Sequence, residues 1–204
     1  MLTGLNLTYI VVLIVCLLIS MTVHEFMHAL VGHKLGDTTA HDEGRLSLNP
    51  LKHIDPLMTV VLPAITLLLF QMPVLAAKPV PFNPARLKYD EYGAAMLAAA
   101  GPVSNLLLAF LAALLTRSLD PSSFFAQVVE LFKQLNVVLF VFNLIPIPPL
   151  DGSRVLYAFA PESLRRLMEQ IEPMGFFIIF ALVLFGGFGG VIVHIDQFVL
   201  NLLP

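Results

Sequence analysis

The chain has 204 residues, of which 58% are hydrophobic and 12% are charged, and its formal net charge is −3. Soluble domains carry about 25% charged residues, so this composition excludes an ordinary soluble protein and indicates an integral membrane protein. The small net charge and the lack of a basic run give no indication of nucleic-acid binding. A single cysteine, Cys16, excludes an intramolecular disulfide and a cysteine-rich metal site.

Long apolar runs predict the membrane-spanning elements. A helix that crosses a bilayer needs about 20 mostly apolar residues, and four segments meet this requirement. The first is expected to be a retained span rather than a secretory signal, because no positive charge precedes it and no small-residue cleavage pattern follows it. The four predicted spans are Leu5–Leu30, Tyr92–Thr116, Leu135–Phe159 and Met174–Leu200.

Shorter elements are predicted between the first two spans. Residues 36–50 are Thr-rich and alternating around Glu43 and Gly44, which predicts a short β-hairpin. The proline-rich residues 78–84 are expected to form an edge strand or a loop. We therefore predict an all-α polytopic membrane protein with one short cytoplasmic β-hairpin, folded as a single domain over residues 1–204.

A fifth apolar segment, 57–77, contains Pro63, Gln71 and Pro73, and its path decides the topology. If all five segments cross, the Lys and Arg residues divide six to five between the two sides, which gives no orientation. If 57–77 enters the membrane and returns, they divide nine to two, and basic residues concentrate in cytoplasmic loops. We therefore expect about four crossings and one re-entrant segment, with the N-terminus outside.

The sequence HEFMH, residues 24–28, lies near the end of the first predicted span. Residues four apart face the same side of a helix, so His24 and His28 can bind one metal ion. Two imidazoles and a carboxylate suit zinc, and they leave a fourth position open for water. The alternative is a pair of histidines that only hydrogen-bond their neighbours, but ionisable groups inside a membrane are costly and usually functional.

A third ligand must come from another segment, and Asp151 in NLIPIPPLDG, residues 143–152, is the best candidate at membrane depth. The three prolines of this stretch break the helix, and unwound backbone inside a membrane usually lines a cavity or a site. Gly152 permits a close approach of the chain. The alternative is a proline kink in which the aspartate caps the next helical turn. With four crossings, Asp151 lies at a similar depth to His24 and His28.

Together these patterns resemble the site-2 protease family of intramembrane zinc metalloproteases. HExxH precedes N-x-x-P-x-x-x-L-D-G in the family's order, and GPVSN at 101–105 resembles the family's G-P-x-x-N motif between them. The flanking GRLSLNPLKHIDP and AKPVPFNP resemble small prokaryotic members that lack a PDZ domain. The resemblance implies that His24, His28 and Asp151 bind one Zn²⁺ per chain and that Glu25 is the catalytic base.

Other polar residues have two possible roles each. Asn143, which we include among the candidate catalytic residues, can donate a hydrogen bond to the substrate or oxyanion, or it can satisfy carbonyl groups freed at the proline break. Asn105 can join helices by hydrogen bonds or contact the substrate. His33, His41 and His53 are expected to be solvated loop residues rather than a second metal site.

The resemblance implies a zinc metalloendopeptidase that hydrolyses a peptide bond in or near a transmembrane segment of a membrane-protein substrate. It implies the plasma membrane of a prokaryote, and the predicted topology places the active site towards the cytoplasmic side. An unwound substrate segment could be held as an added strand at a sheet edge within 36–50 or 78–84. The alternative functions are a membrane zinc transporter or sensor without proteolytic activity, and a structural protein with an incidental HExxH.

Overall fold

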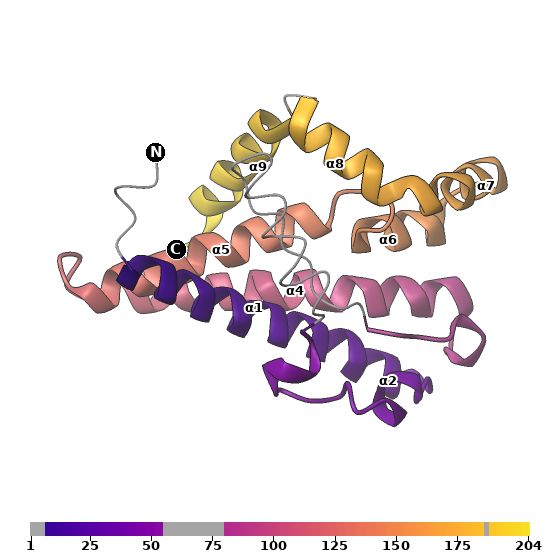
Figure 1. The fold of residues 1–204 in the computed structure, drawn as a ribbon, viewed down its shortest axis with the longest axis horizontal. Coiled ribbons are helices and arrows are strands. Elements are labelled where there is room, and N and C mark those ends of the chain that lie inside the picture. The colour runs from indigo at the N-terminus through magenta and orange to yellow at the C-terminus, as the bar shows by residue number, and fades with distance from the viewer. Residues whose placement is uncertain (1–6, 55–79, 186–187) are drawn as a thin grey trace.

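The computed structural model of the protein describes residues 7–54, 80–185 and 188–204, and these ranges contain helices and loops but no strand (Figure 1). Within these described ranges, three helices are long and apolar enough to cross a membrane. They are α1 (Leu7–Lys34), α4 (Asp90–Thr116) and α5 (Phe124–Asn143). Helix α4 packs against both α1 and α5, so it is the central helix of the bundle.

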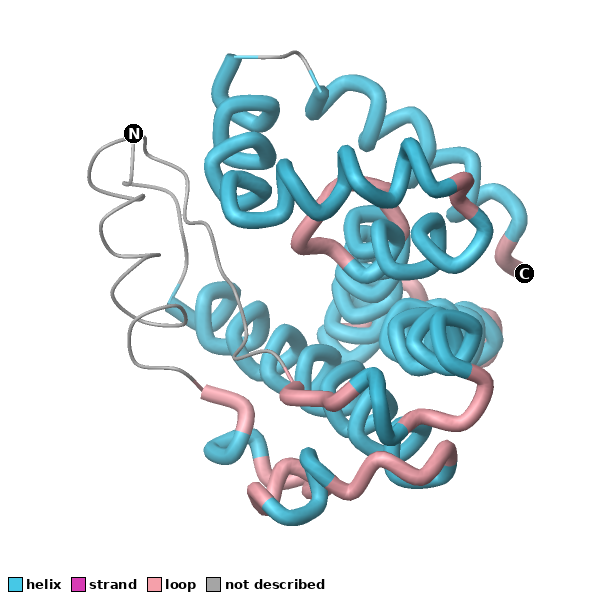
Figure 2. Tube along the Cα trace, turned by 90° about the vertical axis from the view of Figure 1, so that its right-hand side faces the viewer, coloured by secondary structure: helices cyan, strands magenta, loops and turns pink. Residues whose placement is uncertain are grey.

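Shorter helices complete the described chain. Between α1 and α4 lie α2 (Thr39–Asp42), η1 (Pro50–Lys52) and η3 (Pro84–Arg86). After α5 come α6 (Asp151–Phe159), α7 (Glu162–Ile171), η4 (Glu172–Met174), α8 (Gly175–Phe185) and α9 (Phe188–Leu202). Helix α6 packs against α4, and α9 returns to pack against α5. Figure 2 shows the described chain turned by 90°, with helices joined by loops.

Both ends of the segment between α1 and α4 lie at the same end of the bundle. Helices α1 and α5 run in one direction and α4 runs in the opposite one (Figure 1). The Lys88 backbone N–H donates to the Leu35 carbonyl at 2.8 Å, which ties the residues before α4 to the end of α1. The predicted re-entrant segment 57–77 lies outside the described residues.

A glycine ends α1. Gly36 has a φ of +105°, a left-handed conformation that glycine adopts without the steric cost of a Cβ. The backbone N–H groups of Gly36 and Asp37 donate to the His33 and Gly32 carbonyls at 3.1 and 3.0 Å. These two bonds form a Schellman motif. The chain therefore leaves α1 in a tight turn that places Asp37 beside the helix end.

The predicted β-hairpin over residues 36–50 is wrong. This stretch forms α2 and turns before η1, and no strand occurs in the part of the chain that the structure describes. Asp42, for example, donates its backbone N–H to the Thr38 carbonyl at 2.8 Å, as in a helical turn. Asp and Thr side chains bond to nearby backbone groups, which favours turns over a strand ladder. Residues 80–83, the described part of the proline-rich segment, form a loop.

The third predicted span, Leu135–Phe159, has the wrong limits. Helix α5 covers Phe124–Asn143, and the chain leaves it at the predicted proline break before α6 begins. Lys133 therefore lies inside α5 instead of in a loop, and its ammonium group pairs with Glu130 at 2.8 Å. The predicted start is wrong because the first half of α5 carries charged residues such as Glu130 and Lys133, which are typical of a loop outside the membrane.

The fourth predicted span, Met174–Leu200, is not a single helix. It is divided into α8, with 11 residues, and α9, with 15 residues, and both are shorter than the roughly 20 residues that a crossing requires. In Figure 1 the two helices form a V. The sequence GGFGG at 186–190 lies at the division, and glycine disfavours helix continuation by about 1 kcal/mol per residue relative to alanine.

Asp37 connects the end of α1 to the segment before α4. Its carboxylate is buried and accepts hydrogen bonds from the Thr39 backbone and hydroxyl at 3.1 and 2.6 Å and from the Asn83 backbone at 2.7 Å. Burial by itself raises the pKa of Asp37, but these hydrogen bonds outweigh it and hold the pKa below the ordinary value of 3.8. The carboxylate therefore stabilises the fold while it is ionised.

We expect Asp37→Asn to lower the free energy of unfolding by about 1–3 kcal/mol at neutral pH, because an amide nitrogen cannot accept the Asn83 bond. The folded-state pKa is depressed, so this stabilisation is present above a pH of 3.8 and is lost as the pH falls through the folded pKa. Thermal unfolding in detergent, from neutral to strongly acidic pH, measures both effects. Glu43→Gln, at an exposed position, is the control. A variant as stable and as acid-sensitive as wild type would contradict this role of Asp37.

Candidate metal centre

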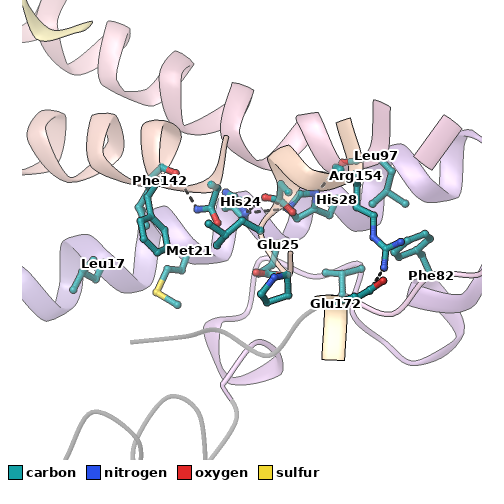
Figure 3. A pocket seen from close by; sticks show the side chains of 17 residues that line it. Leu17, Met21, His24, Glu25, His28, Phe82, Leu97, Phe142, Arg154 and Glu172 are labelled. Carbon is teal, nitrogen blue, oxygen red and sulfur yellow. Dashed lines mark hydrogen bonds and ion pairs between the residues drawn. The ribbon is translucent and has the colours of Figure 1, made fainter. Parts of the chain in front are cut away.

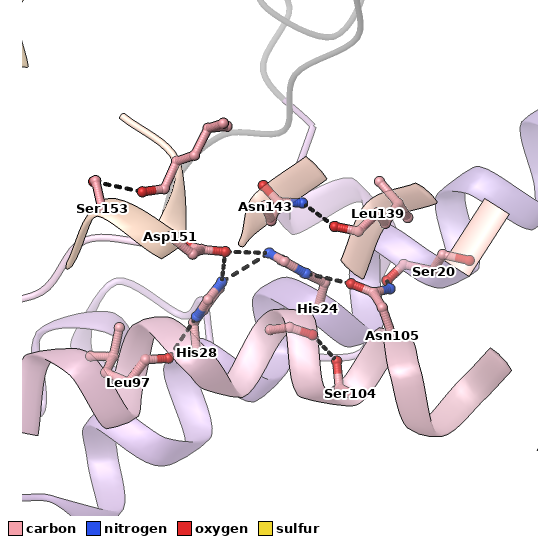
Figure 4. A network of polar contacts seen from close by, with 12 residues as sticks. Ser20, His24, His28, Leu97, Ser104, Asn105, Leu139, Asn143, Asp151 and Ser153 are labelled. Carbon is pink, nitrogen blue, oxygen red and sulfur yellow. Dashed lines mark hydrogen bonds and ion pairs between the residues drawn. The ribbon is translucent and has the colours of Figure 1, made fainter. Parts of the chain in front are cut away.

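Three side chains from two helices converge at one point. His24 and His28 lie one turn apart on α1, and Asp151 is the first residue of α6. The Asp151 Oδ2 atom lies 3.1 Å from His24 Nε2 and 3.3 Å from His28 Nε2, and the two Nε2 atoms are 2.9 Å apart (Figure 4). The structure therefore brings together the three residues that the sequence predicts as metal ligands.

Hydrogen bonds at the other ring nitrogen orient both imidazoles. His24 Nδ1 lies 2.6 Å from the Asn105 side-chain oxygen, and His28 Nδ1 lies 2.8 Å from the Leu97 carbonyl oxygen. Both oxygens can only accept, so each Nδ1 carries the proton and donates it. Each Nε2 then presents a lone pair towards Asp151, which is the tautomer that binds a metal through Nε2.

The donor set fits a zinc ion. Two nitrogen lone pairs and a carboxylate oxygen repel one another when no proton lies between them, and Asp151 Oδ2 is a buried atom without a hydrogen-bond partner. A cation between the three atoms removes this repulsion. With bonds of about 2.0–2.1 Å in a tetrahedral site, neighbouring ligand atoms are about 3.3 Å apart. The observed separations are 2.9–3.3 Å, so the site needs little adjustment to hold zinc.

Gly101 on α4 provides the space for the two imidazoles. A Cβ atom at this position would lie 2.3 Å from His28 Nε2 and 2.6 Å from His24 Nε2. Small residues allow membrane helices to approach each other closely, and α4 is rich in alanine and glycine on the side that is buried. The GPVSN pattern identified this position, but the requirement that it carry no side chain became visible only in three dimensions.

The break after α5 places Asp151 opposite α1. The Ile147 and Leu150 backbone N–H groups donate to the Ile145 and Ile147 carbonyls at 2.8 and 3.0 Å, so the chain turns tightly. A Cβ atom on Gly152 would lie 2.1 Å from the Leu144 carbonyl oxygen, so α6 begins directly against the end of α5. The predicted helix break and the predicted close approach at Gly152 are both confirmed.

Glu25 lies in the same cavity as the three candidate ligands. The cavity has a volume of about 440 Å³, and its walls come from α1, α4, α5, α6, η4 and the residues between 80 and 82 (Figure 3). Glu25 is buried next to His24. Leu17, Met21 and Phe142 form an apolar part of the wall. The cavity can therefore admit an apolar chain segment beside a buried carboxylate.

The two asparagines with alternative roles behave differently. Asn143 lines the cavity, and its Nδ2 donates to the Leu139 carbonyl at 2.9 Å, so it satisfies a backbone group of α5. Its predicted contact with the substrate stays a prediction. Asn105 is fully buried and joins α4 to α1 through His24. It therefore takes the helix-joining role, and it also orients a candidate ligand.

The remaining histidines do not form a second metal cluster in the described ranges. His41 is exposed, and its ring stacks on that of His33 with the ring centres 5.0 Å apart. The expectation of solvent exposure is wrong for His53, which is 4% exposed and whose Nε2 donates to the Ser47 carbonyl at 2.7 Å. The error has a simple cause, because the loop around η1 folds on itself instead of extending as a hairpin.

A charged pair at the edge of the cavity was not recognised in the sequence. Arg154 on α6 donates a hydrogen bond to Glu172 on η4, and its guanidinium lies 6.0 Å from the centre of the Phe82 ring. Arg154 follows Asp151 by three residues, so both lie on the same face of α6. The partners come from distant parts of the sequence, and no local pattern links them.

Comparisons with known proteins identify the family. A family model described as peptidase family M50 matches residues 116–186. The Bacillus subtilis protein YwhC, named as a zinc metalloprotease, is 38% identical over 83% of this chain and 78% of its own length. Rip2 of Mycolicibacterium smegmatis, which is also named as a zinc metalloprotease, is 32% identical over 82% of this chain and 64% of its own length. The chain belongs to peptidase family M50.

Membership of peptidase family M50 confirms the resemblance to site-2 proteases. The protein is therefore an intramembrane zinc metalloprotease, and zinc is its cofactor. No solved structure matches the chain at a significant level.

Gly101→Ala tests whether α4 must lack a side chain beside the imidazoles of the M50 peptidase. We expect the zinc affinity to fall by about tenfold or more, because the added methyl group displaces both Nε2 atoms from Asp151. Gly190→Ala is the control, since no atom lies within 4 Å of its added Cβ and alanine favours the helix by about 0.5–1 kcal/mol. Elemental analysis and chelator competition measure zinc binding. Wild-type affinity in Gly101→Ala would show that the helix can shift to accept the methyl group.

Proposed function

We propose that His24, His28 and Asp151 hold the catalytic zinc, one ion per chain, and that Glu25 is the general base. The observation that carries this proposal is the convergence of two Nε2 atoms and one carboxylate oxygen within 3.3 Å of each other. When bound, zinc lowers the pKa of a coordinated water towards about 7 and polarises the scissile carbonyl. Proton transfer and the binding of the substrate belong to side chains of the protein.

Glu25 is placed to move protons during hydrolysis. It adjoins His24 on α1 and lines the cavity that contains the candidate ligands. Its carboxylate can accept a proton from the attacking water and deliver it to the nitrogen of the leaving amine. Asn143 lines the same cavity, and one of its two N–H groups is used by Leu139. We propose that the second donates to the substrate carbonyl as negative charge develops there.

We propose that the substrate is a transmembrane segment of another membrane protein. The cavity combines apolar walls from Leu17, Met21 and Phe142 with a polar centre, which suits an apolar segment that carries one reactive peptide bond. The segment must unwind, because the hydrogen bonds of a helix shield its carbonyl groups from attack. Val80 and Phe82 also line the cavity, so the unwound segment would lie beside the loop that precedes η3.

We also propose a location in the plasma membrane of a prokaryote, with the N-terminus outside and the zinc site towards the cytoplasm. The bacterial origin of the relatives YwhC and Rip2 supports the location. The excess of Lys and Arg in segments that adjoin the end of α1 supports the orientation, because basic residues concentrate in cytoplasmic loops. Residues 1–204 would form one membrane-embedded domain, because the helices that carry the three motifs pack against each other.

Glu25→Gln separates proteolysis from zinc binding. We expect this variant to retain one zinc ion per chain while cleavage falls by about 10²–10⁴-fold, because an amide cannot accept the proton from water. The readouts are the zinc content and the cleavage of a tagged single-span membrane protein that the wild-type enzyme cuts. Glu43→Gln on the exposed loop is the matched control. Undiminished cleavage by Glu25→Gln would exclude Glu25 as the general base.

Cysteine labelling tests the proposed orientation. In a Cys16→Ser background, Glu43→Cys and Ser122→Cys place single thiols in exposed positions at the two ends of the bundle. We expect a membrane-impermeant maleimide to label Ser122→Cys in intact cells and Glu43→Cys only after the cells are opened. The reverse pattern would invert the topology, and labelling of both in intact cells would contradict the assignment of α1 and α4 as spans.

A further inference from the structure

Three fully buried polar side chains extend from His24 into the middle of the bundle. Asn105 on α4 donates from Nδ2 to Asn136 Oδ1 on α5 at 2.9 Å. Asn136 in turn donates from Nδ2 to the Ser20 hydroxyl on α1 at 2.8 Å. Ser20, Asn105 and Asn136 each have a relative exposure of 0%. The chain of hydrogen bonds therefore connects all three long helices and ends at a candidate zinc ligand, His24, whose contact with Asn105 is shown in Figure 4.

The direction of every bond in this chain is set by backbone carbonyls, which can only accept. The Ser20 hydroxyl donates to the Cys16 carbonyl at 2.8 Å, so its oxygen is left to accept from Asn136. The other N–H of the Asn136 amide donates to the Phe132 carbonyl at 2.8 Å. With both hydrogens used, Asn136 can only present its oxygen to Asn105. Asn105 must then turn its nitrogen to Asn136 and its oxygen to His24.

The orientation of the Asn105 amide decides which nitrogen of His24 carries the proton. When the oxygen faces His24, it accepts from Nδ1, and Nε2 is free to bind a metal. If the amide were reversed, its NH₂ group would face Nδ1, and His24 would carry its proton on Nε2, directed at Asp151. A ligand in that state must lose or move a proton before it can bind zinc.

We propose that Asn136 is a positioning residue for zinc binding, which acts through Asn105 to hold His24 in the metal-binding tautomer. The inference rests on the proposed function, because it requires that His24 is a zinc ligand. Asn136 is not among the residues that line the cavity, and its side chain bonds to Asn105, Ser20 and the Phe132 carbonyl. Its effect is transmitted by the orientation of one amide, and Ser20 and the Phe132 carbonyl hold Asn136 itself in place.

The test compares zinc affinities of purified full-length variants by chelator competition. Asn136→Leu removes the nearer acceptor of the Asn105 amide, at 2.9 Å, and leaves only the long contact of 3.4 Å to the Ser20 carbonyl. We expect zinc affinity to fall by about tenfold or more, as for loss of an outer-shell partner. Gln134→Leu makes the same kind of change at an exposed position on α5 and should leave the affinity unchanged. Ser20→Ala is a milder variant that keeps the Phe132 contact, and we expect a smaller loss from it.

A second substitution distinguishes positioning from general damage to the bundle. Asn105→Asp offers His24 a carboxylate, whose two oxygens both accept, so its orientation no longer depends on Asn136. We expect Asn105→Asp combined with Asn136→Leu to bind zinc within about threefold of Asn105→Asp alone, since the outer-shell acceptor is present in both. A structural defect caused by Asn136→Leu would persist in the double variant. Thermal unfolding without metal measures the structural part separately.

Each outcome decides the proposal. A loss of affinity in Asn136→Leu that Asn105→Asp abolishes supports it. Unchanged affinity in Asn136→Leu, or a loss that persists beside Asn105→Asp, overturns it. If Asn136→Leu does not fold, the same comparison is made with Ser20→Ala. His24→Ala separates a failure of the proposed function from a failure of this inference. Zinc retention in His24→Ala would overturn both. If His24→Ala loses zinc, the Asn136 variants decide whether Asn136 positions His24.

Discussion

The structure is organised around three electron-rich atoms that cannot remain close together without a cation. The Nε2 atoms of His24 and His28 and the Oδ2 atom of Asp151 converge at a site where both imidazoles are buried and the Asp151 side chain is 22% exposed. Packing of α4 against α1, α5 and α6 holds them there. Interactions between charges are strong at low dielectric, so the arrangement favours a divalent ion over solvent and couples metal binding to the stability of the bundle.

The absence of side chains is as important to this centre as the ligands. At Gly101 and Gly152 an added Cβ would lie 2.3 Å from His28 Nε2 and 2.1 Å from the Leu144 carbonyl, respectively. The first glycine allows α4 to pass under the imidazoles, and the second allows α6 to start beside the end of α5. The two glycines thus control the depth and the direction from which the carboxylate reaches α1.

The motif residues were predicted well, including the convergence of Asp151 with His24 and His28, whereas the weak alternation pattern at 36–50 and the polar contacts between buried helices were not. HEFMH on a helix and the proline break before Asp151 follow from local stereochemistry, and the structure has both features. The hairpin at 36–50 was wrong because Asp and Thr side chains stabilise turns there as readily as alternation favours strands. The partnership of Asn105 with Asn136 depends on helix rotation, which a single sequence does not specify. A polar residue in an apolar helix was the only available signal.

The cavity itself explains how hydrolysis can occur within an apolar medium. In Figure 3 the candidate ligands lie between Leu17, Met21 and Phe142 on one side and the Arg154–Glu172 pair on the other. The apolar side suits a chain segment that comes from the lipid, and the charged side binds water. Because α1 and α5 run in the same direction, both deliver their functional residues to the boundary between these two environments. Under the proposed function, a substrate peptide bond held at that boundary would be accessible to water while its flanking residues stay in an apolar environment.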